Sequence, residues 1–206
     1  MSAIQQHWNQ VYASKAVDAV SWYQRHPATS LAMIADSRLD PDAPLIDIGG
    51  GASTLVDHLL DAGYRDVSVL DLAAQALAHA QSRLGSAKAR RVQWIAADVT
   101  QFAPSRSYAL WHDRAVFHFL TDETARNAYL STLRRSLVAG GTAIIATFAA
   151  DGPTRCSGLD VARYDADALA ACFGDGFERV ASARDMHVTP WGATQAFTYI
   201  RMRRSR

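Results

Sequence analysis

Short apolar runs alternate with amphipathic stretches along most of the chain from residue 44 onward. The apolar runs have the length of buried strands, and the stretches between them carry apolar residues at helical spacing. We expect strands at 45–48, 67–71, 92–96, 108–111 and 142–148, and helices at 53–62, 73–84 and 123–137. Strands that alternate with helices are joined by right-handed crossovers, so this pattern predicts a parallel sheet covered on both faces.

The last part of the chain departs from that alternation. A short helix is expected at 165–173, followed by strands at 177–187 and 194–201. The link between these strands carries Pro190 and Gly192 and is too short for a helical crossover, so the strands should pair antiparallel. The pattern therefore predicts an α/β fold: a single doubly wound, mostly parallel seven-stranded sheet with a C-terminal antiparallel hairpin.

The residues before the first strand need a place to pack. They include an amphipathic segment with Trp8 and Tyr12, and a helix expected at 28–37. The natural place is over the carboxyl ends of the strands, where ligands bind in such sheets. We expect residues 1–43 to form an N-terminal helical cap there, as part of the same domain as the core at 44–206.

Composition and charge narrow the classes of function. A length of 206 residues fits one domain with a sizeable core. The formal net charge of +1 offers no broad basic surface to a nucleic acid. No apolar run reaches the roughly 18 residues of a membrane span, so we expect no membrane partner. The one basic cluster is interpreted as a solvated strand end and consists of Arg201, Arg203, Arg204 and Arg206.

The cysteines and the N-terminal sequence bear on the compartment. Cys156 and Cys172 are too few for a disulfide framework or for a zinc site of the usual spacing. The opening residues MSAIQQHWNQ lack the charged head and apolar stretch of a signal peptide. We therefore expect a reducing, cytoplasmic setting and no metal ion.

A glycine-rich turn follows the first predicted strand, in the sequence Asp47-Ile48-Gly49-Gly50-Gly51-Ala52-Ser53. Glycines let the chain turn sharply into a helix here and let a ligand approach the backbone closely. Asp71 ends the second strand, where a carboxylate can accept hydrogen bonds from both hydroxyls of an adenosine ribose. Asp98 follows the third strand, placed to accept from the amino group of adenine. The alternatives are a tight turn without a ligand and Asp residues that only cap helices or turns.

The identity of the ligand depends on what surrounds the glycines. The nicotinamide fingerprint requires a third glycine where this chain has Thr54. Asp47 would be poorly placed beside a pyrophosphate but is well placed near a cation. S-adenosylmethionine (SAM) carries no phosphate and has a sulfonium and an ammonium group, so these residues favour SAM.

The same positions resemble the successive motifs of class I SAM-dependent methyltransferases. The resemblance is carried by residues 47–51, Asp71, Asp98 and the sequence Leu137-Val138-Ala139-Gly140-Gly141, and it covers about residues 44–204. It implies a Rossmann-like fold, SAM as cofactor and S-adenosylhomocysteine (SAH) as product. One departure is Ser53, where many members have a glycine. The cofactor-binding residues that it implies are Trp22, Tyr23, Asp47, Gly49, Gly50, Gly51, Asp71, Leu72, Asp98 and Val99.

Two groups within that superfamily are similar on the substrate side. The turn His112-Asp113-Arg114-Ala115 resembles that of thiopurine S-methyltransferases and of protein-lysine methyltransferases that act on elongation factors. The N-terminal segment is similar to the cap of both groups, which implies that Trp22 and Tyr23 cover the cofactor. An aromatic face beside a sulfonium is also physically favourable, because cations are attracted to aromatic rings.

Catalytic roles are expected for Asp113, Arg114 and His118. Methyl transfer is an in-line displacement in which alignment supplies most of the acceleration, so a general base is optional. His112 and His118 are candidates for one, because a histidine titrates near neutral pH. The alternative is a core histidine at His112 and a helix-face residue at His118.

The acceptor is expected to be a small, largely neutral molecule with a thiol or an aromatic heteroatom as nucleophile. We expect no dedicated protein-docking domain, and we expect aromatic residues at the mouth of the site, which suits an apolar pocket. The main alternative is a protein lysine, since such methyltransferases can also be one small domain. A nicotinamide enzyme or a nucleotide-binding module is the third interpretation.

Overall fold

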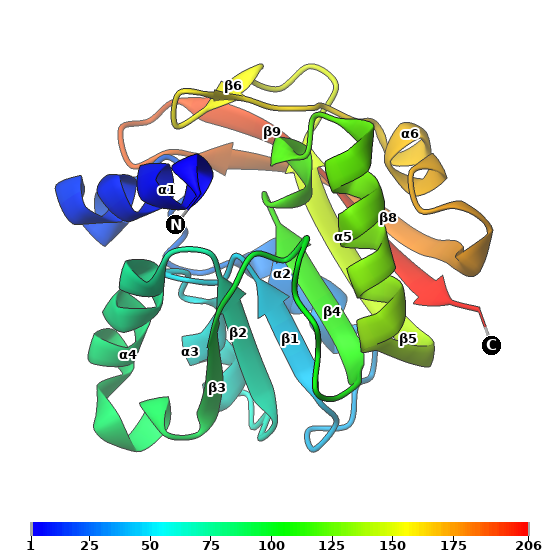
Figure 1. Cartoon of the computed structure of the whole chain (residues 1–206), viewed down its shortest axis with the longest axis horizontal. Coiled ribbons are helices and arrows are strands. Elements are labelled where there is room, and N and C mark those ends of the chain that lie inside the picture. The colour runs from blue at the N-terminus through cyan, green and yellow to red at the C-terminus, as the bar shows by residue number, and fades with distance from the viewer. Residues whose placement is uncertain (1, 206) are drawn as a thin grey trace.

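A single seven-stranded sheet runs through the molecule (Figure 1). The structure is a computed structural model that describes residues 2–205, so Arg206 of the basic cluster lies outside the described residues. The sheet has the order β3-β2-β1-β4-β5-β9-β8. Its strands are β1 (Leu45–Ile48), β2 (Val67–Asp71), β3 (Val92–Ala96), β4 (Tyr108–Arg114), β5 (Leu137–Phe148), β8 (Phe177–Val188) and β9 (Thr194–Arg204).

The pairing confirms the predicted sheet and its terminal hairpin. Strands β1 to β5 are parallel, and Leu45 at the start of β1 pairs with Val67 of β2 and Leu110 of β4. Strand β9 lies antiparallel to both β5 and β8. The order reverses direction at β1, whose neighbours β2 and β4 lead to opposite halves of the sheet, and ligands bind at the carboxyl edge of such a point.

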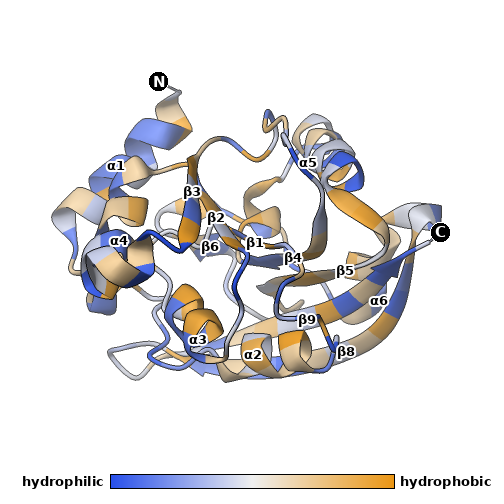
Figure 2. Ribbon diagram, turned by 90° about the horizontal axis from the view of Figure 1, so that it is seen from below, coloured by the Kyte–Doolittle hydropathy of each residue, from blue (hydrophilic) through white to orange (hydrophobic). Residues whose placement is uncertain are grey.

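Helices cover both faces of the sheet (Figure 2). One hydrophobic core joins the sheet to α2 (Ala28–Ala35), α3 (Leu55–Asp61) and Leu77 of α4 (Ala74–Ala89). A second core, on the other face, joins the sheet to α5 (Glu123–Ser136) and to α6 (Ala166–Ala171). Leu169 of α6 and Phe173, just after it, belong to this core. Successive side chains of a strand point to opposite faces, so each strand contributes to both cores.

The N-terminal segment divides between two positions. Helix α1 (Ala3–Ser14) lies at the carboxyl edge beside α4 (Figure 1), and the Nε2 atom of Gln5 donates to the carbonyl of Leu72 just after β2 at 3.3 Å. A 3-10 turn, η1 (Val17–Ala19), follows. Helix α2 instead packs into the core through Met33 and Ile34, because its apolar residues need a sheet face. Helix α1 thus lies at the carboxyl edge, and α2 packs on a face of the sheet.

The region after β5 contains more structure than the loop expected there. Arg155–Cys156 (β6) and Leu159–Asp160 (β7) pair as a small antiparallel hairpin, and Cys156 is buried. Two further 3-10 turns are η2 (Phe117–Phe119) and η3 (Gly174–Gly176). Among residues 2–205, the helices are too short or too polar for any of them to cross a membrane.

Candidate active site

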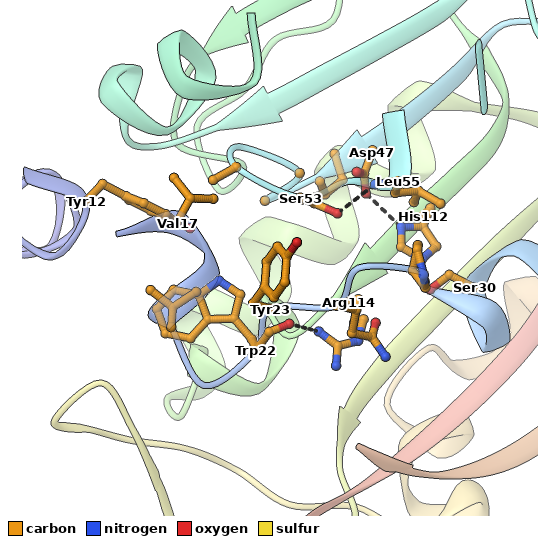
Figure 3. A pocket seen from close by; sticks show the side chains of 17 residues that line it. Tyr12, Val17, Trp22, Tyr23, Ser30, Asp47, Ser53, Leu55, His112 and Arg114 are labelled. Carbon is orange, nitrogen blue, oxygen red and sulfur yellow. Dashed lines mark hydrogen bonds and ion pairs between the residues drawn. The ribbon is translucent and has the colours of Figure 1, made fainter. Parts of the chain in front are cut away.

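An enclosed pocket of ≈ 40 Å³ lies where β1 and β4 end, beneath the segment that follows α1 (Figure 3). Its walls come from the N-terminal segment, from α2, from the glycine turn and from alternate positions of β4. The residues that line it are Tyr12, Val17, Val20, Trp22, Tyr23, Gln24, Pro27, Ser30, Asp47, Ile48, Gly49, Gly50, Ala52, Ser53, Leu55, His112 and Arg114.

The glycine turn is shaped by two carboxylates. A Cβ atom on Gly50 would lie 2.3 Å from Oδ2 of Asp47, and one on Gly51 would lie 2.3 Å from Oδ2 of Asp71. Gly49 has a φ of +67°, and a Cβ there would lie 2.2 Å from a methyl group of Val116. Any side chain would therefore displace a neighbour, so these three positions require glycine.

Asp47 is part of a buried hydrogen-bonded chain. A carboxylate only accepts, so Nδ1 of His112 donates to Oδ1 of Asp47 at 2.7 Å. Nε2 of His112 then accepts from the hydroxyl of Ser30 on α2 at 2.9 Å. All three residues are buried, and Oδ2 of Asp47 has no hydrogen-bond partner among the residues that the structure describes. The chain therefore orients Asp47 and leaves one of its oxygens free at the pocket.

Asp71 lies against the glycine turn and is buried under the cap. Its Oδ1 accepts from the backbone N–H of Ala73 at 2.8 Å. Burial raises the pKa of Asp71 to about 7, opposed by backbone N–H groups of Ala73 and Gly51. Burial raises the pKa of the Tyr12 phenol on α1, and the nearby charge of Asp71 raises it further. The structure thus places Asp71 and the glycine turn together, with α1 above them.

Three other residues were expected to contact the nucleoside, and none of them lines the pocket: Leu72, Asp98 and Val99. Oδ1 of Asp98 accepts from the backbone N–H and the hydroxyl of Thr100, at 2.8 and 2.7 Å, as a turn-forming Asp does. Leu72 is engaged through its carbonyl by Gln5, and Val99 is buried in the core on the α5 face. Roles for these three in binding adenine stay predictions.

Aromatic side chains tie the cap to the turn. The ring of Trp8 meets those of Trp22 and Phe119 edge-on, with centroids 5.8 and 5.1 Å apart. Tyr12 packs against Trp22 at 6.2 Å and belongs to a small core with Ala73. Trp8 is thus a packing residue of the cap, whereas Trp22 and Tyr23 line the pocket as expected for residues over a cofactor.

Arg114 is the one predicted catalytic residue that lines the pocket. Its Nε donates to the hydroxyl of Tyr199 at 3.0 Å, and Nη1 donates to the carbonyl of Trp22 at 3.1 Å (Figure 3 shows the second bond). Its guanidinium carbon lies 4.4 Å from the ring centroid of Phe197, a cation–π contact. Arg114 therefore joins the sheet to the segment that covers the pocket.

Asp113 points to the opposite face of the sheet. It is completely buried, and its carboxylate accepts from the hydroxyl of Tyr129 at 2.6 Å and from the backbone N–H of Val116 at 2.8 Å. Burial raises the pKa of Asp113 to about 6, opposed by the hydrogen bonds from Tyr129 and Val116. These contacts give Asp113 a positioning role: it fixes the turn after β4 and does not line the pocket.

His118 is likewise buried away from the pocket. Its Nδ1 accepts from the backbone N–H of Phe148 at 3.3 Å, and its ring packs against Phe119 and Phe148. Burial, reinforced by the charge of Arg114, lowers the pKa of His118 to about 3. Its surroundings are those of a neutral core histidine on the turn η2, and the catalytic role expected for His118 stays a prediction.

Two residues of the site carry no local sequence signal. Ser30 contacts His112 across 82 residues of sequence. Arg83 of α4 donates to the carbonyls of Ala52 and Ser53 in the glycine turn, at 3.0 and 2.6 Å. Long-range contacts of this kind depend on the fold, so neither residue type nor spacing could have indicated them.

Comparison with known proteins adds a family match to this geometry. Residues 45–141 match the family model of a methyltransferase domain, a range that includes the glycine turn, Asp71 and β4. A search of curated protein sequences finds no match.

Several solved structures share the fold over nearly the whole chain. One, from a study of the conversion of a disulfide bond into a thioacetal group in echinomycin biosynthesis, has a TM-score of 0.80 at 18% identity, covering 98% of this chain and 93% of that one. The 1,6-didemethyltoxoflavin-N1-methyltransferase of Burkholderia thailandensis has a TM-score of 0.72 at 19% identity, covering 98% and 84%. The N-methyltransferase NodS of Bradyrhizobium japonicum WM9, in complex with SAH, has a TM-score of 0.72 at 16% identity, covering 96% and 98%.

Proposed function

We propose that the chain is a SAM-dependent methyltransferase that transfers the methyl group to a small-molecule acceptor bound beside the pocket described above. The structural neighbours do not distinguish between the thiopurine and lysine methyltransferase groups that the sequence resembles. NodS and the toxoflavin enzyme are N-methyltransferases by name, which supports the class of reaction but not a particular acceptor.

The residues of the pocket fit the charges of SAM. The free Oδ2 of Asp47 suits the ammonium group of the methionine end, since a buried carboxylate oxygen needs a donor or a cation. Tyr23 and Trp22 supply aromatic surface beside it, which suits the sulfonium. Asp71, beneath Tyr12 and against Gly51, would hold the ribose hydroxyls. Asp47 places a carboxylate beside the glycine turn, and its negative charge would repel a pyrophosphate.

The cap must move for SAM to enter. A cavity of ≈ 40 Å³ holds a few water molecules and is smaller than SAM. The contacts that hold α1 in place include Gln5 to Leu72, Tyr12 to His79, and the packing of Trp8 on Trp22. We infer that α1 and the segment to Gln24 shift outward when the cofactor binds and then pack on it.

Bound SAM supplies an electrophilic methyl group, and the chain supplies its alignment and a dry environment. The chain from Ser30 through His112 to Asp47 fixes the carboxylate at the methionine end. Asp113 holds the turn that carries Arg114 and thereby sets the wall of the acceptor side. Both ring nitrogens of His112 are already hydrogen-bonded, so His112 is not free to act as a general base, in agreement with catalysis by alignment.

The enclosed shape of the pocket is the observation that supports a small molecule as the acceptor. The pocket is covered by the N-terminal segment, whose aromatic and aliphatic side chains lie beside the polar side chains of the glycine turn, α2 and β4. A folded protein could present only a narrow side chain to such a space. The test is transfer of a radiolabelled methyl group from SAM to a cell extract separated by size. Label in the small-molecule fraction supports the proposal, and label confined to a discrete protein band contradicts it.

One feature favours the alternative of a lysine acceptor. An open groove between the segment 18–29 and the end of β8 shares Tyr23 and Gln24 with the enclosed pocket. Two acidic residues, Asp18 and Asp185, line it together with the basic Arg25, and an ammonium group is attracted to the carboxylates. If the label appears on a protein, Asp18→Asn should reduce that labelling, because it removes one of the two charges.

A further inference from the structure

The open groove between the segment 18–29 and the end of β8 is large enough for a small molecule. Its volume is ≈ 540 Å³, within the range of small-molecule sites, against ≈ 40 Å³ for the enclosed pocket. Tyr23 and Gln24 line both spaces and therefore form the boundary between them. A molecule in the groove would reach the enclosed pocket at these two side chains.

Asp185 of β8 lines the groove and has an oxygen without a donor. Its Oδ2 is buried and has no hydrogen-bond partner among residues 2–205. Asp185 pairs in register with Phe197, which belongs to the core on the α2 face, so the Asp185 side chain lies on that face. Nη2 of Arg114, beside the same Phe197, also lacks a partner there, so the guanidinium does not satisfy this oxygen. Burying a carboxylate oxygen without a donor is costly, so the position favours a ligand that brings N–H groups.

Two further acceptors lie near Asp185 on the same face. Nε2 of His187 is 2.6 Å from the carbonyl of Ser21, and because a carbonyl only accepts, Nε2 carries the proton and Nδ1 of the neutral ring is an acceptor. Burial, followed by the charge of Arg114, lowers the pKa of His187, so the ring is neutral at neutral pH. Gln195 pairs with His187 in register, and its Oε1 is buried without a partner in the described part of the chain. This end of the β8–β9 hairpin therefore offers acceptors to an N–H donor.

The charges and the rim of the groove favour a cation on an apolar body. Asp18 and Asp185 are its carboxylates, and Arg25 opposes them. Arg25 is exposed, so water and salt screen its charge, whereas Oδ2 of Asp185 is buried. Met186 and Val188 add apolar surface to the lining, with 53% and 59% of each residue exposed. An alkylammonium group on an apolar molecule matches these features.

We propose that the groove is the acceptor site and that Asp185 binds an alkylammonium group of a small-molecule acceptor, as an anchor separate from the atom that is methylated. This inference rests on the proposed function. Asp185 does not line the enclosed pocket, so an ammonium group held by it stays outside the space proposed for SAM.

The chemistry of transfer requires a second group on the acceptor. An ammonium nitrogen has no lone pair, so another nucleophile must reach past Tyr23. Its lone pair forms a bond to the methyl carbon, the carbon–sulfur bond of SAM breaks with both electrons remaining on sulfur, and the proton of the nucleophile leaves to solvent. A lysine side chain has a single nitrogen for both roles, so this division favours a bifunctional small molecule.

The first arm of the experiment uses protein loaded with SAH, which keeps the probes from Asp47. The probes are 2-phenylethylamine, 2-phenylethanol and 3-phenylpropionate. NMR titration should show that the amine binds about tenfold more tightly than the alcohol, as for a charge-assisted hydrogen bond, and that the carboxylate does not bind. Asp185→Asn removes the charge and keeps the shape of the side chain, so this variant should bind the amine and the alcohol about equally.

Glu178→Gln is the matched control. Glu178 is an exposed acid at the other end of the same strand and does not line the groove, so the variant should keep the full preference for the amine. Equal affinities of the wild type for amine and alcohol would overturn the proposal, and so would a preference that survives in Asp185→Asn. If Asp185→Asn does not fold, shifts of the wild-type amide signals of residues 185–188 on addition of the amine, and not of the alcohol, take its place.

Binding of SAH is measured on the same samples and separates this proposal from the proposed function. No binding of SAH would overturn the proposed function. The three probes on the unliganded protein, wild type and Asp185→Asn, would then still decide whether Asp185 binds a cation.

The second arm separates a small-molecule amine from a protein lysine. Wild type and Asp185→Asn are compared in the transfer of radiolabelled methyl groups to a cell extract separated by size. The proposal predicts less label in the small-molecule fraction with the variant, and label in the wild-type product on an atom other than its basic nitrogen. Label confined to a protein, or carried by the anchoring amine itself, would overturn it.

Discussion

His112 and Asp47 lie side by side on adjacent strands, paired in register between β4 and β1, with Nδ1 of His112 2.7 Å from Oδ1 of Asp47. Both side chains are buried at 2% exposure. Because His112 donates to Oδ1, only Oδ2 of Asp47 is without a hydrogen-bond partner among the described residues, and Ser30 donates to the far side of the imidazole. The register of two parallel strands thus sets the orientation of the carboxylate that we propose binds the cofactor.

Removing His112 should affect both stability and cofactor binding. In His112→Leu the buried Oδ1 of Asp47 loses its donor, so the free energy of unfolding should fall by about 1–3 kcal/mol, and the affinity for SAH should fall as well. Ser30→Ala keeps the bond between His112 and Asp47 and should have a smaller effect on both. Denaturant unfolding and calorimetry measure the two quantities. A His112→Leu protein with unchanged SAH affinity would exclude His112 from the orientation of Asp47.

Replacing Asp71 should weaken binding of the nucleoside. Asp71→Ala removes the carboxylate expected to accept from the ribose hydroxyls, with a loss of about 1–3 kcal/mol in SAH binding. Asp66→Ala is the matched control, because Asp66 lies just before β2, at the other end of that strand, and pairs with Arg106. Calorimetry on both folded variants is the measurement. Equal affinities for the two would remove Asp71 from the site.

Strand β4 shows how far the sequence predicts the site. The strand was expected to end at Trp111, but it continues to Arg114 because Asp113 and Arg114 pair with Ile145 and Ala146 of β5. Successive side chains of a strand point to opposite faces of the sheet, and this decides which residues from 112 to 114 can contact a ligand. His112 and Arg114 face α2 and the pocket, whereas Asp113 faces Tyr129 of α5.

The cofactor turn was predictable because its chemistry is local. Gly49, Gly50 and Gly51 follow a buried strand directly, and backbone shape alone requires glycine at each of them. The contacts of Arg114 were not predictable, since they are made to Tyr199, Phe197 and Trp22 on segments far away in sequence. A local sequence pattern does not indicate which residues of distant segments will contact it in the fold.

The cap should become ordered on the cofactor. Trp22→Ala removes the ring that joins Trp8 and Tyr12 to the pocket, so SAH affinity should fall and the amide protons of α1 should exchange faster. Trp191→Ala is the control, because that ring is 61% exposed. Hydrogen exchange with and without SAH measures the effect. Deletion of the residues before Pro27 with binding and turnover intact would contradict the role of the cap.

Acid should destabilise the protein partly through His118. Its pKa is about 3 in the folded protein, against 6.5 as the ordinary value, so the unfolded chain takes up a proton as the pH falls below 6.5 while the folded protein does not. The free energy of unfolding should then fall by up to about 1.4 kcal/mol per pH unit. His118→Asn keeps an acceptor for the N–H of Phe148 and does not titrate. Between pH 7.5 and 5.5, the free energy of unfolding of the variant should fall less than that of the wild type, by about 1 kcal/mol or more. Identical slopes would mean that His118 takes up a proton in the folded protein.

Calorimetric titration of the purified protein with SAH and, separately, with NADH tests the central claim most directly. The account predicts one SAH per chain and no measurable heat from NADH, because the pocket presents the carboxylate of Asp47 where a pyrophosphate would lie. Asp47→Asn should weaken SAH binding by about tenfold or more, since the ammonium group loses its counter-charge. Binding of NADH without binding of SAH would contradict the account.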